Sequence, residues 1–250
     1  MMRSCLVRFG SGLALCAACA GAAHAGEAST APASACAESP QVAASAYRDR
    51  VDAMDRELGV PAGYAGSHLL APVPEAPELV VAGRDIRGRP VQLAPSAAVA
   101  LQEMIIGAGN AGIKLQIVSG YRSANYQAGL LRDKLGRGMK IDSALRINAP
   151  PGYSEHQGGC AVDLTTPNSI AADESFARTR AYAWLVQRAC EYGFHLSYPA
   201  DNPHGIEFEP WHWRFVASTA PSASTNARLA PAQHASRPAA AATGGTPDIE

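Results

Sequence analysis

Two stretches with few large apolar side chains limit the part of this 250-residue chain that can fold. Residues 26–45 and 217–250 consist mainly of Ala, Ser, Thr and Pro, and the second stretch contains no aromatic residue. Such segments cannot bury enough apolar surface to offset the conformational entropy that is lost on ordering. We therefore expect a disordered linker over 26–45, a disordered tail over 217–250, and one folded domain over 46–216.

The first 25 residues have the features of an export signal. Arg3 and Arg8 precede a weakly apolar run, and the small side chains of Ala23 and Ala25 fit cleavage after Ala25. The run is too short to span a bilayer, and no later segment is a candidate for a transmembrane helix. This pattern predicts a signal peptide over 1–25 and a periplasmic or secreted mature protein.

The composition is that of an ordinary globular protein, with 47% hydrophobic and 17% charged residues and a formal net charge of -1. The near-zero charge and the absence of a Lys/Arg block argue against nucleic acid or an anionic membrane surface as the main partner. We expect a monomer.

Three cysteines remain after the predicted signal peptide, namely Cys36, Cys160 and Cys190. An oxidising compartment permits a disulfide, and a Cys160–Cys190 bond would join a strand to a helix. Two separately buried thiols are the alternative. The mature chain has no CxxC pair, which excludes a cysteine-rich zinc site.

Helical and strand patterns alternate within 46–216 without the regular repetition of βαβ units. Helical periodicity predicts four helices, at 47–58, 96–112 (with Ser96 as the capping residue), 123–136 and 176–192. The last of these would turn Tyr182, Leu185, Val186 and Ala189 inward. Strand patterns occur at 78–82, 90–93, 113–120, 194–199 and 206–216, and the first two suit a hairpin. These patterns predict an α+β fold in which helices pack on a mostly antiparallel sheet.

Two motifs contain the residue types of a catalytic metal site. The stretch GYSEHQGGCAVDL contains His156 and Asp163, and EPWHWRFV contains Glu209 and His212. Two imidazoles and a carboxylate are a typical protein ligand set for catalytic zinc, which leaves a coordination position for water. Zinc lowers the pKa of that water to about 7, and Glu209 could then act as the base.

Local geometry tests this interpretation. Side chains alternate between the two faces of a strand, so Glu209 and His212 would point in opposite directions along a regular strand. Pro210 favours a bend between them, since it cannot donate a ladder hydrogen bond. Gly158 and Gly159 likewise permit a tight turn that returns the chain toward Asp163. Glu207 is the second choice for the base, and His204 is the main competing imidazole.

The segment SGYRS follows an apolar strand and precedes a helix. Its Arg122 could hold a substrate carboxylate through its planar guanidinium, whereas a surface ion pair is the alternative. Further candidates for substrate contacts are Ser119, Tyr121, Gln127 and Ser154. Glu155 and Gln157 flank His156, where they could face solvent or orient a ligand.

Together, SGYRS…YQ, SEHQGGCAVDL and EPWHWRFV resemble the VanY-type D-alanyl-D-alanine carboxypeptidases over about residues 78–216. This zinc metallopeptidase group includes lysostaphin-type enzymes and the hedgehog domain. The resemblance implies a hedgehog/D,D-peptidase-like fold and Zn²⁺ held by His156, Asp163 and His212. It also implies Glu209 as the catalytic base and Arg122 as a contact for the substrate carboxylate or the oxyanion.

The substrate that this resemblance implies is a peptidoglycan stem peptide ending in D-Ala-D-Ala, from which the terminal D-Ala is hydrolysed. Three alternatives stay open. They are a peptidoglycan endopeptidase, a D-Ala-D-Ala dipeptidase, and a non-catalytic module that binds the cell wall and is stabilised by zinc. Gly158 and Cys160 depart from the usual family pattern and could alter substrate choice.

Overall fold

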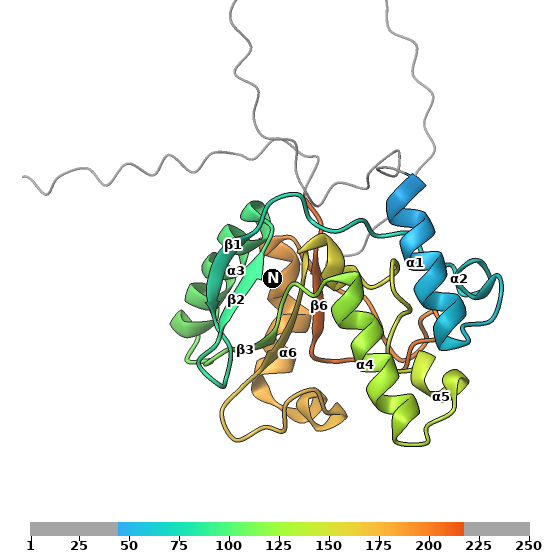
Figure 1. Cartoon of the computed structure of the whole chain (residues 1–250). Coiled ribbons are helices and arrows are strands. Elements are labelled where there is room, and N and C mark those ends of the chain that lie inside the picture. Colours follow the sequence, from blue (N-terminus) through green and yellow to red (C-terminus); the bar gives the residue numbers. More distant parts are fainter. Residues whose placement is uncertain (1–44, 218–250) are drawn as a thin grey trace, which may run out of the picture. The chain divides into compact units, whose positions relative to one another are not determined.

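The structure is a computed structural model that describes residues 45–217 (Figure 1). The predicted signal peptide, the linker before Ser45 and the tail after 217 lie outside the described residues. The helices are α1 (Ser45–Leu58), α2 (Tyr64–Ser67), α3 (Pro95–Asn110), α4 (Ala124–Gly136), α5 (Ile141–Leu145), α6 (Arg180–Arg188) and the 3-10 helices η1 (Glu155–Gly158), η2 (Glu174–Arg178) and η3 (Ala189–Tyr192). The strands are β1 (Val80–Arg84), β2 (Pro90–Leu93), β3 (Gln116–Ser119), β4 (Ala161–Thr165), β5 (Phe194–Leu196) and β6 (His212–Phe215).

These strands form two antiparallel sheets, which confirms the predicted α+β class. β1 and β2 form the expected hairpin, and the second sheet has the order β3-β4-β6-β5. A parallel bridge between Asp85 and Ile117 joins the end of β1 to β3. The hairpin therefore lies against the outer edge of the larger sheet.

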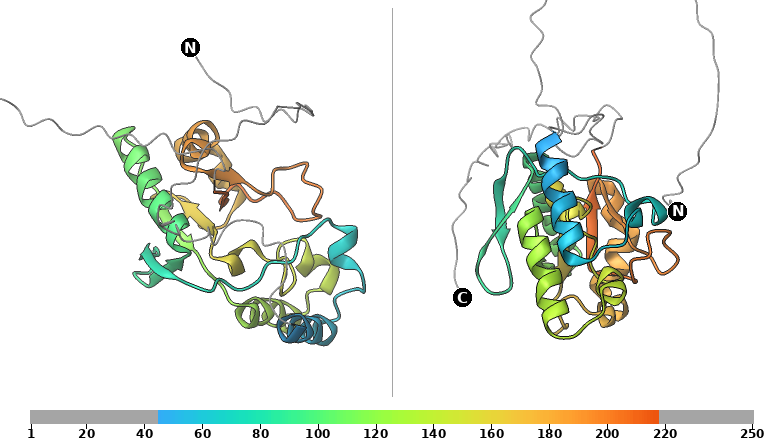
Figure 2. Two further views of the ribbon diagram at one scale, coloured as in Figure 1. Left: turned by 90° about the horizontal axis from the view of Figure 1, so that it is seen from above. Right: turned by 45° about the vertical axis from the view of Figure 1, so that its right-hand side comes forward.

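Helices cover both faces of the larger sheet (Figures 1 and 2). The main core lies between one face and helices α3 and α6, and it includes Met104, Leu164, Leu185 and Trp213. A second apolar cluster joins α1, α4 and α5 through residues such as Leu131. Figure 2 shows that this second helical group lies on the opposite side of the sheet from α3 and α6.

The register of the larger sheet aligns polar side chains from three strands. Asp163 on β4 is the Cα partner of Ser119 on β3 and of His212 on β6. Directly paired residues point to the same face of a sheet. Val162 and Leu164, which flank Asp163, point to the opposite face and are fully buried in the main core. The alternation along β4 thus separates the core face from a polar face.

Several predicted boundaries differ from the structure, and three of the differences have a clear physical cause. Helix α3 begins at Pro95 with Ala94 as its N-cap, because Pro at the first position is preorganised for a helix and lacks the N–H that would need a cap. Ser96 is therefore not the capping residue. The strand expected over 206–216 is also shorter, since only His212–Phe215 pair in the sheet and the backbone N–H of Glu207 instead donates to Arg146.

The helix expected over 176–192 is divided into η2, α6 and η3. Thr179 interrupts it, because its extended backbone ends η2 and its side chain accepts a hydrogen bond from the N–H of Tyr182 to start α6. Leu185 and Ala189 face the core as predicted, but Val186 is 56% exposed. Ala181, Leu185 and Ala189 are spaced four residues apart and form the buried stripe, so Val186 falls outside it.

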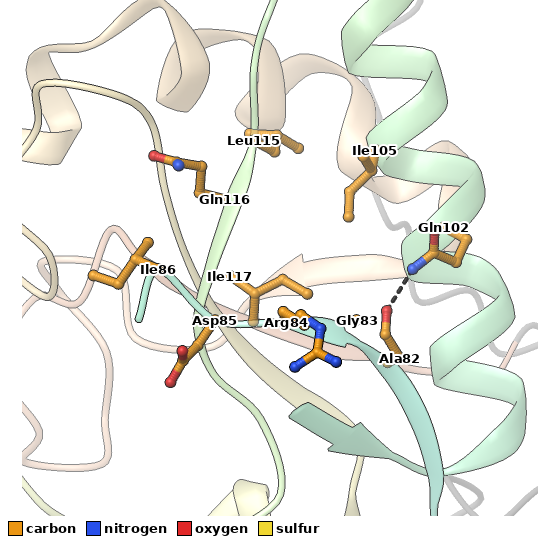
Figure 3. A pocket seen from close by; sticks show the side chains of 10 residues that line it. All are labelled: Ala82, Gly83, Arg84, Asp85, Ile86, Gln102, Ile105, Leu115, Gln116 and Ile117. Atoms are coloured by element: carbon orange, nitrogen blue, oxygen red, sulfur yellow. Dashed lines mark hydrogen bonds between the residues drawn. The ribbon is translucent and has the colours of Figure 1, made fainter. Parts of the chain in front are cut away.

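None of the helices between residues 45 and 217 combines the length and the apolar character of a membrane span. An open pocket of about 220 Å³ lies between β1, α3 and β3 (Figure 3). Ile105 and Leu115 form part of its apolar wall, and Gln102 donates to the carbonyl of Ala82 at its side. No predicted site residue lines this pocket.

Candidate metal centre

Three side chains that were predicted as metal ligands come together on the polar face of the sheet. Each of His156, Asp163 and His212 offers one ligand atom, and these atoms lie within 4.8 Å of one another. All three residues are buried. They come from η1 and from two paired strands, so both a turn and a strand register are needed to bring them together.

His156 is presented by the tight turn between η1 and β4. Gly159 ends η1 with a φ of 68°, and an added Cβ there would lie 2.8 Å from the backbone nitrogen of Ala94. Nδ1 of His156 lies 2.7 Å from the carbonyl oxygen of Gly120 and donates to it. Nε2 therefore carries no hydrogen and is the atom that can bind a cation.

Gly120 itself requires the absence of a side chain. An added Cβ would approach a Val91 methyl group at 2.5 Å and the carbonyl oxygen of Gln92 at 2.8 Å. The glycine thus lets the end of β3 lie close to β2, which places its carbonyl group against His156. The pKa of His156 falls to about 4, first because burial disfavours its charged form and second because Arg122 is adjacent.

His212 presents its other ring nitrogen. Its Nδ1 lies 3.2 Å from Oδ1 of Asp163, whereas its Nε2 lies 2.8 Å from Oε2 of Glu155. Burial acts to lower the pKa of His212, but hydrogen bonds with Asp163 and Glu155 outweigh it and raise the pKa to about 10. The two histidines thus approach the aspartate through different atoms, Nε2 for His156 and Nδ1 for His212.

Asp163 is the centre of the cluster. Its Oδ1 lies 3.3 Å from Nε2 of His156, and its Oδ2 accepts a hydrogen bond of 2.8 Å from Nη2 of Arg122. Burial would raise the pKa of Asp163, but His156 and Arg122 hold it well below the usual value. The aspartate is therefore ionised at neutral pH.

Arg122 already places a cationic group against two of the three ligands. Its Nη2 lies 2.5 Å from Nε2 of His156 as well as next to Asp163. Its Nε is buried without a partner among the described residues, so one donor is left for another group. Arg122 is thus not the surface ion pair that was the alternative from sequence.

Glu209 lies beside the cluster, with its Oε2 3.7 Å from Nδ1 of His212. The predicted bend at Pro210 is present as a turn, in which the N–H of His212 donates to the carbonyl of Glu209. Burial raises the pKa of Glu209 to about 7; His212 and Arg122 oppose this effect, while Asp163 and Glu155 add to it. A carboxyl group with a pKa near the working pH is well suited to general base catalysis.

Of the remaining predicted substrate residues, Ser119 ends β3, Tyr121 lies in the loop that follows it, Gln127 lies on α4, and Ser154 precedes η1. Ser119 lies opposite Asp163 in the sheet, and the backbone N–H of Tyr121 donates to Gln92. Ser154 is buried directly before η1, and Gln157 accepts a hydrogen bond from its backbone N–H. Gln127 is 1% exposed and donates to the carbonyl of Ala149, so its amide supports the chain before the turn that carries His156.

The competing candidates lie elsewhere. Glu207 pairs with Arg146 at 2.9 Å, and its side chain is 42% exposed. Nδ1 of His204 contacts the carbonyl oxygen of His68. Neither residue contacts the three clustered ligands.

Sequence reasoning missed three residues that contact Glu155 or His212. Ser197 and Arg214 contact Glu155, and the ring of Tyr198 lies 4.9 Å from the ring of His212. Ser197 and Tyr198 follow β5, and Arg214 lies on β6. The sequence marks Ser197 and Tyr198 only as part of a predicted strand and Arg214 only as part of EPWHWRFV, and their contacts depend on how β5 pairs with β6.

The donor set fits a divalent metal ion. Two imidazole nitrogens and one carboxylate are compatible with zinc and with other first-row divalent ions, and binding at His212 would release its Nδ1 proton. The fold and the site therefore define an α+β metallohydrolase-like domain with a candidate base beside its metal ligands.

Comparison with known proteins gives the family. The model of the VanY family, described as D-alanyl-D-alanine carboxypeptidase, matches residues 90–218, and the chain belongs to this family. A bifunctional D-Ala-D-Ala dipeptidase and D-Ala-D-Ala carboxypeptidase, VanXYC of Enterococcus gallinarum, is 31% identical over 155 residues, which are 60% of this chain and 80% of that protein.

Two further likenesses extend this result. The putative carboxypeptidase YodJ of Bacillus subtilis (strain 168) is 33% identical over 172 residues, which are 67% of this chain. The chain spans only 60% of that relative's length. The solved structure of the LdcB LD-carboxypeptidase shares 32% sequence identity, with a TM-score of 0.52 over 58% of this chain and 71% of that one.

Proposed function

We propose that this protein is a zinc-dependent D,D-carboxypeptidase that removes the terminal D-Ala from peptidoglycan stem peptides ending in D-Ala-D-Ala. The observation that carries the proposal is the convergence of His156, Asp163 and His212 within 4.8 Å, beside Glu209. Membership of the VanY family supports the substrate class.

Zn²⁺ would be held by Nε2 of His156, Nδ1 of His212 and the Asp163 carboxylate, and when bound it would lower the pKa of water and polarise the scissile carbonyl group. Glu209 accepts the proton of the attacking water and later passes it to the departing amine. Its partial burial keeps competing solvent away from this proton.

Arg122 is proposed to bind the free carboxylate of the terminal D-Ala. Its unpartnered, buried Nε supplies a donor for this contact. A guanidinium that pairs with a terminal carboxylate favours release of the last residue over cleavage inside a chain. Ser119, Tyr121 and Ser154 are proposed to line the path of the peptide, and Gln127 to support the metal-binding turn from behind.

We propose that the protein acts outside the cytoplasm. We also propose that it is a monomer. Cys160 and Cys190 are both disulfide-bonded, and they are the two cysteines of the described residues. A disulfide is typical of an oxidising compartment. This feature agrees with the signal peptide that the N-terminal sequence predicts.

The test is mass spectrometry of defined muropeptides after incubation with the zinc-loaded full chain. We expect a pentapeptide ending in D-Ala-D-Ala to lose one D-Ala, and we expect a chelator to abolish this loss. Glu209→Gln should lower kcat by about 10²- to 10⁴-fold, which is the usual contribution of a general base. The same change at the exposed Glu207 is the control and should retain activity.

Further substrates separate the alternatives. One similar solved structure is that of an LD-carboxypeptidase. The same activity in this protein would appear as release of D-Ala from a tetrapeptide. Cleavage of a free D-Ala-D-Ala dipeptide would indicate a dipeptidase, and cleavage of cross-linked dimers would indicate an endopeptidase. Bound zinc without turnover of any of these peptides would contradict the enzyme proposal and favour a binding module.

A further inference from the structure

Glu155 lies on the far side of His212 from the metal ligands, and the proposed mechanism gives it no part. Its Oε2 is 2.8 Å from Nε2 of His212 and 2.6 Å from Oγ of Ser197. Its Oε1 is 3.4 Å from Nη1 of Arg214. The Glu155 side chain is only 15% exposed, so this carboxylate is held largely within the protein.

The chemistry of these partners determines which nitrogen of His212 carries a hydrogen. An ionised carboxylate only accepts hydrogen bonds, while the Ser197 hydroxyl and the Arg214 guanidinium donate to it. Nε2 of His212 must therefore be the donor in its contact with Glu155. When a cation takes the place of the hydrogen on Nδ1, the hydrogen on Nε2 stays with Glu155, and the lone pair that is freed lies on Nδ1, the atom that faces Asp163.

We propose that Glu155 is a positioning residue that fixes both the tautomer and the ring orientation of His212 for metal binding. The inference rests on the proposed function in taking zinc as the ion of this site. The carbonyl of Gly120 does the same for His156, from which it accepts the Nδ1–H. The two ligands are thus oriented by acceptors of different strength, a neutral carbonyl and a charged carboxylate.

The contact between Glu155 and His212 depends on both η1 and the larger sheet. Glu155 precedes His156 in η1, so one short turn provides a ligand and the group that orients a different ligand on β6. Ser197 follows β5, and Arg214 lies on β6 opposite His195. Pairing of β5 with β6 therefore brings the two residues that hold Glu155 to the same place.

The test is the zinc affinity of the metal-free full chain, measured by competition with a chromophoric chelator. Glu155→Gln should weaken zinc binding by about 10- to 100-fold, the range found when groups that orient metal ligands are replaced. Glu207→Gln makes the same change at an exposed position and should leave the Kd unchanged. Ser197→Ala, which removes one donor to Glu155, should weaken zinc binding by about two- to fivefold, the loss of one ordinary hydrogen bond.

Glu209→Gln is the control for charge, because it also removes a carboxylate near His212 but does not contact Nε2. We expect Glu155→Gln to weaken zinc binding more than Glu209→Gln does. Equal losses in the two variants would show a general effect of charge and would overturn the positioning role.

The melting temperature of each metal-free variant separates this role from a structural one. An unchanged Kd with a lowered melting temperature in Glu155→Gln would overturn the inference while leaving the proposed function intact. Normal zinc binding by the wild-type chain without turnover of any peptide would contradict the proposed function and leave the inference about Glu155 intact. If Glu155→Gln does not fold, the Ser197→Ala affinity decides, and an unchanged Kd there would contradict the proposal.

Discussion

The protonation state of a buried carboxyl group in this protein depends on whether a charged or hydrogen-bonding partner offsets the cost of burying its charge. Asp163 is buried and ionised because His156 and Arg122 contact it. Asp55 on α1 is in the opposite situation. Its Oδ1 is buried without a hydrogen-bond partner among the described residues, and it lines a cavity of about 380 Å³ with Asp52, Tyr64 and Tyr153.

Asp55 should therefore make stability depend on pH. Burial, and then the charge of Asp52, raise its pKa from 3.8 to about 7. A raised folded-state pKa means that the folded protein keeps this proton between pH 3.8 and about 7 while the unfolded chain releases it. The stability contribution is thus complete below this window and is lost as the pH rises through it.

Replacing Asp55 by Asn should increase the free energy of unfolding at pH 8 by about 1–2 kcal/mol, a value reduced for the partial exposure of the carboxyl group. The gain should shrink toward zero at pH 4, where the wild-type group is neutral. Urea unfolding at both values of pH measures it. Asp49→Asn, at an exposed position of the same helix, is the control, and an equal gain in both variants would contradict the prediction.

At the scale of elements, the segment before β1 supports the turn that carries His156, a candidate metal ligand. The N–H groups of Val73 and Ala76 donate to the carbonyls of Gly152 and Gln157, on both sides of His156. The hydroxyl of Tyr47 on α1 donates a hydrogen bond to the carbonyl of Val73 and accepts one from the side-chain amide of Gln157. This segment precedes the residues that match the family model, yet it contacts the turn that carries a ligand.

Glu75 is the residue of this segment that joins α1 to α4. One of its oxygens accepts from the N–H of Ala124 at the start of α4, and the other pairs with Arg50. Glu75→Ala should lower the free energy of unfolding by about 1 kcal/mol, as for the loss of a helix cap. Thermal unfolding measures the effect, and Glu78→Ala, three residues away and exposed, should cost less.

Features of the fold that depend on local contacts could be predicted from the sequence, and features that depend on distant contacts could not. Helix α4 begins after Ser123 as predicted, since its side chain accepts from the N–H of Tyr126 in a purely local contact. Thr179 makes the same kind of contact, but it was not recognised because no turn-type residue such as Gly or Pro lies beside it to mark the break. The sequence of residues 206–211 is typical of a strand. These residues do not pair in the sheet, because the N–H groups of Glu207 and Glu209 donate to the carbonyls of Arg146 and Tyr198.

The candidate ligands could be selected from residue types and motifs, whereas their surroundings could not. His156, Asp163, Glu209 and His212 lie in recognisable motifs, and the structure brings them together. The link from Glu155 to His212 spans 57 positions, and it depends on η1 meeting β6. A spacing rule cannot predict a contact of that kind.

At the scale of the whole molecule, the disulfide is a constraint on the unfolded chain. A bond between Cys160 and Cys190 closes the loop from the start of β4 to η3, which contains η2 and α6. Cys190→Ser should lower the free energy of unfolding by about 2–4 kcal/mol. A reductant should destabilise the wild-type protein by a similar amount in urea unfolding, whereas it should not affect the variant. Reductant-insensitive stability of the wild type would contradict this assignment.

The direct pairing of Asp163 with His212 has a consequence for how this protein can change in evolution. A shift of the β4–β6 register by one residue would turn one of these ligands toward the apolar core while the other still faced the opposite side. Insertions or deletions inside either strand would therefore disrupt the candidate metal centre and the sheet together. Variation between homologues should accumulate in the connections outside these strands, where a change of length leaves the pairing intact.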